Sequence, residues 1–258
     1  MRALLWLIAP GAAAAFLVSL ALAQGSDPRR SGYQDMGAAL RAMQDDDTAN
    51  PGMLWVLEGK ALWARRAGAD GKACADFHAG ESAMAGVAAR YPAFDAATSK
   101  PIDLGQRIQR CRVEQQKAEP LSGESRELLA LTAFVARQSR GQPIAPPDDE
   151  RLRPFTEAGE ALWRLRQGQL NLSCAQCHDD NAGGRLAGAT IPQGHPTGYP
   201  IYRLEWQDMG SLKRRLRNCL VGMRAEPFAH DSAESVALEL YLMSRARGMK
   251  LEAPGVRP

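Results

Sequence analysis

The sequence predicts an all-α fold in which two related domains follow one another. Apolar residues recur at helical spacing, for example on one face of residues 124–139. No stretch stands out as rich in strand-forming residues. The third observation is an internal repeat, in which residues 59–63 (GKALW) recur as residues 159–163 (GEALW). One helical domain is therefore expected to be present twice.

The repeat extends well beyond these two tryptophans. Each tryptophan is followed by a cysteine and then a histidine, at positions 74 and 78 in the first copy and 174 and 178 in the second. Residues 104–111 match residues 212–219, and both segments end in a cysteine. The last helices of the two copies match as well. We therefore place one domain at residues 53–147 and the other at residues 148–258.

The chain begins with a segment typical of a secretory signal peptide. Arg2 is the only charged residue before Asp27, an apolar stretch covers residues 4–22, and small residues precede a cleavage site before Gln24. The stretch is also about long enough for an uncleaved membrane anchor, which is the alternative. We expect residues 1–23 to be removed and the mature protein to lie in the periplasm.

The first domain follows a polar segment. Residues 24–52 are rich in turn residues, so we expect an N-terminal extension that wraps the first domain or contacts a partner. The helical pattern begins at residue 53, and further helices are expected at about 103–113 and 124–139. Residues 141–149 contain prolines and acidic residues, which indicates the linker between the domains.

The second domain is expected to begin with a helix at about 156–167 that leads into a cysteine motif. A Gly- and Pro-rich loop at 181–199 is typical of a segment that covers a haem. Helices are expected again at 212–220 and 234–245, and Ser232 is placed to cap the last of them.

The cysteine motif predicts a cofactor. Cys174, Cys177 and His178 form a C-x-x-C-H sequence. This spacing is typical of c-type haem attachment, in which both thiols bond the haem and the histidine binds its iron. A local disulfide or a zinc knuckle is the alternative, but a knuckle needs a second ligand pair at zinc spacing, which the sequence lacks. We therefore expect one haem c, attached in the periplasm.

The overall charge gives no sign of nucleic acid as a partner. Once Arg2 is removed with the signal peptide, the 32 basic residues fall to 31 against 29 acidic residues. Nucleic-acid-binding domains usually carry a strong basic excess. Aromatic residues make up only 6% of the chain, which suits a helical protein whose cofactor fills much of its core.

Three cysteines lie outside the haem motif: Cys74, Cys111 and Cys219. The sequence alone allows any of three pairings, and one thiol is left over. The repeat favours a Cys74–Cys111 disulfide, because both residues belong to the first copy, where Phe77 replaces the second cysteine of the motif. The alternative is a haem held by a single thioether at Cys74, with His78 beside it.

Cys219 is then the free thiol, and the repeat places it opposite His178 across the haem. Other candidate ligands are more easily explained as core or exposed loop residues: Met209, Met223, Met243, His195 and His230. Arg215 precedes Cys219 by four residues, so the two side chains share a helix face. Cations favour thiolate over thiol, and a guanidinium suits a small sulfur oxyanion. For Arg214 and Arg217, a solvated basic face explains the charge equally well.

Four segments of the second domain carry a family resemblance: 215–219 (RLRNC), 222–228 (GMRAEPF), 238–242 (LELYL) and 251–256 (LEAPGV). With the C-x-x-C-H motif, they resemble SoxA, the catalytic c-type cytochrome subunit of the SoxAX complex in bacterial thiosulfate oxidation. The resemblance implies that Cys174 and Cys177 hold the haem and that His178 and Cys219 are its axial ligands. It also implies that Cys219 is the cysteine persulfide of the active site and that Arg215 binds the substrate.

Dihaem members of this family carry a second C-x-x-C-H motif in the first domain. The sequence departs from that pattern at Phe77, so it resembles the monohaem type, in which a disulfide takes the place of the first haem. The first domain is therefore expected to be cytochrome c-like, with a degenerate haem site.

The resemblance also implies an activity, L-cysteine S-thiosulfotransferase. Thiosulfate would be joined oxidatively to a cysteine of the carrier protein SoxYZ, and electrons would pass through the haem to the SoxX cytochrome and then to a soluble cytochrome c. A c-type cytochrome that only transfers electrons is the main alternative. A redox sensor whose thiolate ligand responds to a small molecule is a third.

Overall fold

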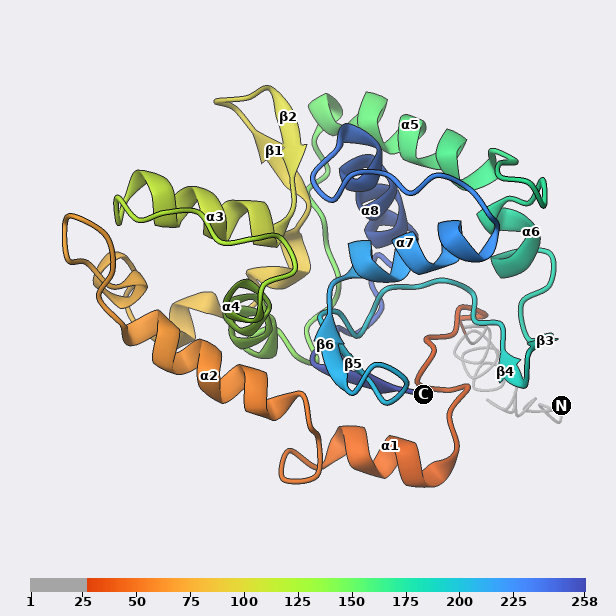
Figure 1. Cartoon of the computed structure of the whole chain (residues 1–258), viewed down its shortest axis with the longest axis horizontal. Coiled ribbons are helices and arrows are strands. Elements are labelled where there is room, and N and C mark those ends of the chain that lie inside the picture. Colours follow the sequence, from red (N-terminus) through yellow and green to blue (C-terminus); the bar gives the residue numbers. More distant parts are fainter. Residues whose placement is uncertain (1–26) are drawn as a thin grey trace, which may run out of the picture.

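The computed structural model describes residues 27–258. The predicted signal peptide, residues 1–23, lies outside these residues. Two helical units stand next to one another, and the first described helix lies below the second unit, near the C-terminus (Figure 1). Within residues 27–258, none of the helices combines the length and the apolar character needed to cross a bilayer.

The two units repeat the same order of elements. The first is preceded by α1 (Ala38–Asp45) and contains α2 (Met53–Ala64), a 3₁₀ turn (Cys74–Phe77), the hairpin β1 (Ala93–Asp95) and β2 (Lys100–Ile102), α3 (Leu104–Glu114) and α4 (Arg126–Arg137). The second contains α5 (Arg153–Arg164), α6 (Cys174–His178), β3 (Arg185–Leu186), β4 (Ala189–Thr190), β5 (Ile201–Arg203), β6 (Asp208–Gly210), α7 (Leu212–Gly222), α8 (Ala233–Arg245) and β7 (Gly255–Arg257).

A glycine in the repeated segment permits the main helix crossing of each unit. Where α2 crosses α4, a Cβ at Gly59 would overlap the carbonyl oxygen of Ala130. Where α5 crosses α8, a Cβ at Gly159 would overlap the carbonyl oxygen of Ala237 in the same way. The sequence repeat thus has a physical basis, because only glycine lets the two backbones approach this closely.

Each crossing brings a tryptophan into a buried core. Trp63 packs with Phe134 in the first unit, and Trp163 packs with Leu238 and Leu242 in the second. A third cluster joins the units, and in it Ile144, from the predicted linker, is fully buried. The linker is therefore held between the two units rather than free.

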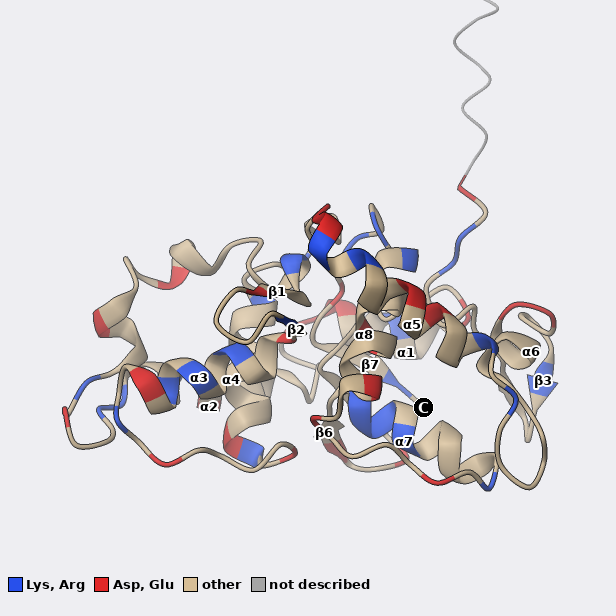
Figure 2. Ribbon diagram, turned by 90° about the horizontal axis from the view of Figure 1, so that it is seen from above, with Lys and Arg blue, Asp and Glu red and all other residues tan. Residues whose placement is uncertain are grey.

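The helices begin and end much as the sequence predicts. Ser232 caps α8, because its hydroxyl accepts a hydrogen bond from the Ser235 amide at 3.3 Å. Asp103 caps α3 and Ser211 caps α7 in the same manner. Acidic and basic residues are interspersed along both units, with basic residues gathered on α7 (Figure 2).

The fold is helix-rich, as predicted, and it also contains short strands that the all-α prediction did not include. β5 pairs antiparallel with β6 and parallel with the C-terminal strand β7. The N-terminal extension binds the edge strand β7 of this sheet, because the Gln44 side chain accepts a hydrogen bond from the Val256 amide at 2.9 Å. Strands of two or three residues are too short to show an alternating pattern, which is why the sequence did not predict them.

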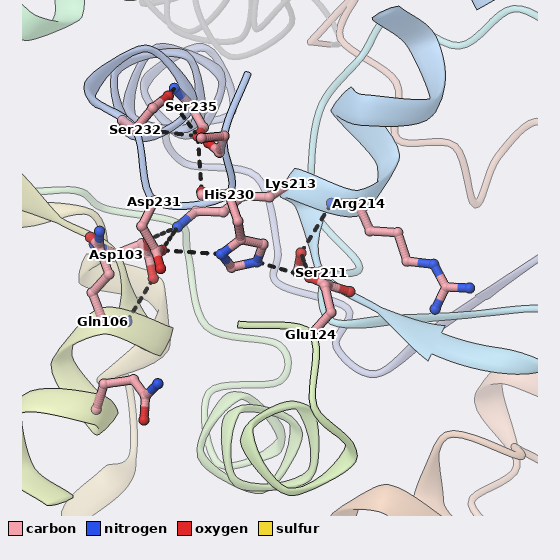
Figure 3. Close-up of polar contacts among 12 residues, drawn as sticks. Asp103, Gln106, Glu124, Ser211, Lys213, Arg214, His230, Asp231, Ser232 and Ser235 are labelled. Carbon is pink, nitrogen blue, oxygen red and sulfur yellow. Dashed lines mark hydrogen bonds and ion pairs between the residues drawn. The ribbon is translucent and has the colours of Figure 1, made fainter. Parts of the chain in front are cut away.

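Contacts between charged side chains join the two units (Figure 3). The His230 ring lies between two carboxylates, with Nε2 3.0 Å from Glu124 Oε1 and Nδ1 3.1 Å from Asp231 Oδ1. Glu124 belongs to the first unit, and the other two residues belong to the second. Hydrogen bonds to Asp231 and Glu124 raise the pKa of His230 to about 9, so the ring is protonated at neutral pH.

We predict that the free energy of unfolding falls as the pH rises from about 6.5 to about 9. The folded state holds the His230 proton more tightly than the unfolded chain, so this stabilisation is complete below pH 6.5 and is lost as the pH passes the folded pKa of about 9. Glu239, whose pKa burial raises to about 8, acts in the same direction.

Urea unfolding across this pH range measures the effect. In the His230→Gln variant the loss of stability should be smaller by about 1–2 kcal/mol, a value reduced for partial solvent screening. His195→Gln is the control, because burial lowers the pKa of His195 and its titration lies below this range. Equal pH dependence in His230→Gln and the unaltered protein would contradict the prediction.

Candidate haem and thiol site

The C-x-x-C-H motif forms the short helix α6. Ser173 caps it, because its hydroxyl accepts a hydrogen bond from the Gln176 amide at 3.2 Å, and the Gln176 side chain accepts one from the Ser173 amide at 2.9 Å. This reciprocal capping fixes the first turn. Cys174, Cys177 and His178 therefore project from a single turn of helix, as attachment to one porphyrin requires.

The loop predicted to cover the haem orients His178. Its Nδ1 lies 2.7 Å from the carbonyl oxygen of Pro192, so this nitrogen donates a proton and leaves Nε2 free to bind a metal. Burial lowers the pKa of His178, which favours the neutral ring that metal binding needs. The Trp163 ring lies against it, with centroids 5.5 Å apart.

Asp179 and Arg245 support this arrangement, and the sequence analysis missed both. Asp179 accepts a hydrogen bond from Trp163 Nε1 at 2.8 Å and another from Arg245 Nη2 at 2.7 Å. The Arg245 guanidinium also lies 4.7 Å from the centre of the Trp163 ring. The position of Asp179 directly after the motif was the only local signal, and nothing in the sequence links it to a residue on α8.

A cavity of about 400 Å³ opens beside His178. Residues from separate parts of the second unit line it, including Trp163, His178, Tyr199, Arg215, Leu216 and Cys219. Arg215 and Cys219 lie one turn apart on α7, and both reach the cavity, so the predicted shared helix face is confirmed. The structure thus brings His178, Cys219 and Arg215 to one space.

Basic side chains outnumber acidic ones in the cavity lining, which contains Arg185, Arg203, Arg215 and Arg257 against Asp35. Burial and the charge of Arg215 lower the pKa of Arg203. Arg203 pairs with Glu205 at 2.6 Å and Arg257 pairs with Glu252 at 2.8 Å. Among residues 27–258, Arg215 has no acidic partner within ion-pair distance, so its guanidinium is available to an anion.

The other two arginines of α7 have different surroundings. Arg214 lies 4.4 Å from the centre of the Trp206 ring and pairs with Asp208 at 3.1 Å. Arg217 is exposed to solvent. Neither belongs to the cavity lining. The solvated-face interpretation holds for Arg217, whereas Arg214 is half-buried against Trp206 and Asp208.

Most of the alternative ligands point elsewhere. Met209 packs in the core of the first unit, Met243 packs in the cluster between the units, and Met223 caps the end of α7. Within the described chain, none of the three lines the cavity. His230 belongs to the network between the units. His195 lines the cavity, but its Nδ1 lies 2.9 Å from the Arg30 carbonyl oxygen.

The first unit has a corresponding cavity of about 330 Å³. Its lining contains the counterparts of the second site: Trp63, Cys74, His78, Arg107 and Cys111. Cys74 and Cys111 thus line the same cavity, where both carry free thiols. Burial and the neighbouring Cys111 raise the pKa of Cys74 to about 11. Pairing of these two thiols stays a prediction.

Comparison with known proteins identifies the family. The model for the SoxA/TsdA cytochrome c domain matches residues 58–144 and again residues 158–251. The chain belongs to the SoxA/TsdA cytochrome c family. The double match agrees with the repeat and shows a cytochrome c-like domain in each half. A cytochrome c domain binds haem c, and the donor set of α6, with the free Nε2 of His178, fits that cofactor.

The relatives cover almost the same length. The L-cysteine S-thiosulfotransferase subunit SoxA of Pseudaminobacter salicylatoxidans is 38% identical over 233 residues, which span 90% of this chain and 82% of the relative. The subunit of the same name from Rhodovulum sulfidophilum is 36% identical over 92% of this chain and 83% of its own. The crystal structure of SoxXA from P. pantotrophus superimposes with a TM-score of 0.86 at 33% identity and covers 89% of this chain and 87% of that one.

We predict that Gly194→Ala weakens haem retention and destabilises the fold. Gly194 has a φ of +77°, and a Cβ there would lie 2.8 Å from the Trp163 ring and 3.5 Å from the His178 side chain. The expected loss is about 1–3 kcal/mol in the free energy of unfolding, together with a lower haem content of the purified protein.

Gly188→Ala is the matched control. Gly188 lies in the same loop with a φ of +85°, but a Cβ there would meet nothing within 4 Å. The Gly188→Ala variant therefore has the same unfavourable left-handed backbone but no steric overlap with neighbouring side chains. Equal haem content in the two variants would show that Gly194 does not support the Trp163–His178 contact.

Proposed function

We infer that the chain is the SoxA subunit of an L-cysteine S-thiosulfotransferase, which joins thiosulfate to a cysteine of the carrier protein SoxYZ. One observation carries this proposal. A free thiol and an unpaired guanidinium lie one helical turn apart in the cavity that the haem-binding histidine lines. A cytochrome that only transfers electrons needs neither group.

Each site residue has a separate role. Cys174 and Cys177 would attach a single haem c, and His178 and Cys219 would hold its iron. When bound, the haem supplies an iron that accepts electrons one at a time. Arg215 holds the thiosulfate dianion through its planar set of donors, and the paired Arg203 and Arg257 add to the positive field around it.

The reaction balances as an oxidation. A sulfur–sulfur bond forms between the carrier cysteine and the outer sulfur of thiosulfate, and one proton and two electrons leave. Cys219, as a thiolate or as a persulfide, takes part in the sulfur transfer. The two electrons would pass to the SoxX cytochrome and then to a soluble cytochrome c.

Three further features complete the proposal. The similarity to SoxXA supports a SoxX partner. Phe77 stands where the first copy of the motif would need its second cysteine, which supports a single haem and a degenerate first site. The N-terminal apolar stretch supports export to the periplasm, where thioether attachment takes place.

We predict that Cys219→Ala lowers thiosulfate-dependent turnover with the carrier by more than about a hundredfold, because the reactive thiol is removed. Steady-state assays with purified SoxYZ and a cytochrome c acceptor measure the loss. Cys219→Met is the informative comparison, because a thioether can still bind the iron but cannot carry sulfur. Full activity of the methionine variant would support the electron-transfer-only alternative.

We predict that Arg215→Met raises the KM for thiosulfate by about ten- to a hundredfold, because a charge-assisted contact with the dianion is lost. Arg217→Met is the matched control, since Arg217 is on the same helix but exposed and outside the cavity lining. The ratio of the two KM values is the measurement. If both variants behave alike, Arg215 has no specific part in binding thiosulfate.

A further inference from the structure

The first turn of α7 is fastened to the first domain by a buried ion pair. The Lys213 side chain is only 5% exposed, and its Nζ lies 2.5 Å from Asp103 Oδ2 and 2.8 Å from Asp231 Oδ1 (Figure 3). Lys213 is outside the lining of the haem cavity, whereas Arg215 and Cys219 on the same helix belong to it. One face of α7 therefore holds the helix in place while another presents the reactive groups.

A second hydrogen bond, at the start of α3, fixes the position of the Asp103 carboxylate. It caps α3, because its Oδ1 accepts a hydrogen bond from the Gln106 amide at 2.9 Å. The second carboxylate oxygen is then left for Lys213. Since α3 and α7 are counterparts in the repeat, the ion pair joins the start of one helix to the start of the other.

A second connection reaches the residue before α7. The hydroxyl of Ser211 accepts a hydrogen bond from the Arg214 amide at 3.1 Å and donates one to Glu124 of the first domain. Glu124 is also bound by His230. Of the three carboxylates that hold the first turn of α7, Asp103 and Glu124 thus come from the other domain, and Asp231 belongs to the second domain itself.

The surrounding charges keep Lys213 ionised. Burial alone would lower its pKa, but Asp103, Glu239 and Asp231 together raise the pKa of Lys213 above its ordinary value. Burial and the neighbouring Asp103 raise the pKa of Glu239, so its carboxyl is largely protonated at neutral pH. The lysine therefore acts as a charged link with a fixed geometry, held mainly by Asp103 and Asp231.

We propose that Lys213 is a positioning residue for the thiosulfate reaction: through its ion pair with Asp103 it sets the place of α7, and so of Arg215 and Cys219, relative to His178. The inference rests on the proposed roles of Arg215 and Cys219. A displacement of about 1 Å in reacting groups can lower a rate by about a hundredfold, so a loosened α7 should be visible in the chemistry.

The experiment compares Lys213→Met with Lys213→Met/Asp103→Asn in the full complex with SoxX. The single variant leaves a buried carboxylate without its partner, which destabilises the fold by itself. Asparagine keeps the helix cap and removes that charge, so the double variant should recover the melting temperature. Lys60→Met is the control for losing a lysine, because Lys60 pairs with Glu81 at 2.9 Å but is 59% exposed.

We expect the double variant to keep a kcat about ten- to a hundredfold below that of the unaltered protein, with a ferric haem spectrum that shows partial loss of the Cys219 ligand. Normal kcat, KM and spectrum at a normal melting temperature would overturn the proposal and leave Lys213 a stabilising residue only. If the double variant does not fold, Asp103→Asn alone serves: an unchanged spectrum and kcat would overturn the proposal equally.

The outcome is separable from that of the proposed function. Retained activity in Cys219→Ala would remove the catalytic role of the thiol. The haem spectrum of the Lys213 variants would still report whether the ion pair holds α7 against the cofactor, because that spectrum does not depend on turnover.

Discussion

The placement of α7 is the constraint on which the site depends. This one helix carries both the free thiol and the unpaired guanidinium, and each must reach the cavity beside His178. The helix is 11 residues long, and Lys213 and Ser211 bind its first turn to the other domain. The histidine side is fixed separately, by the Pro192 carbonyl and the Trp163–Asp179–Arg245 contacts. The two sides of the cavity are therefore held in place by separate sets of contacts.

The duplicated domain shows which parts of such a site survive without a full haem motif. The helix crossing at Gly59, the tryptophan–histidine contact of Trp63 with His78, and the cysteine of α3 all persist. These features belong to the helical core, whose packing does not require a second thioether. Two carboxylates of the first domain, Asp103 and Glu124, also hold the first turn of α7. The first domain thus supports the helix that carries Arg215 and Cys219.

Local patterns let the sequence predict the haem motif, the main helices, the cap at Ser232 and the shared face of Arg215 and Cys219. The sequence did not predict the contacts between distant segments of the chain. Four such contacts join residues that are far apart in the chain: the pairing of β5 with β7, the hydrogen bond of Gln44 to β7, the Asp179–Arg245 contact and the Lys213–Asp103 ion pair. No periodicity or spacing rule links such residues, since the tertiary fold alone brings them together. The Cys74–Cys111 bond and the domain boundaries stay predictions.

In the proposed function, Cys219 and His178 hold the same haem iron. X-ray absorption at the iron edge, on the ferric protein in its complex with SoxX, tests it directly. We expect one imidazole nitrogen and one short thiolate sulfur as axial ligands, and the sulfur should disappear when Cys219 is replaced by alanine. Two nitrogen ligands, or the longer bond of a methionine thioether, would show that Cys219 does not bind the iron.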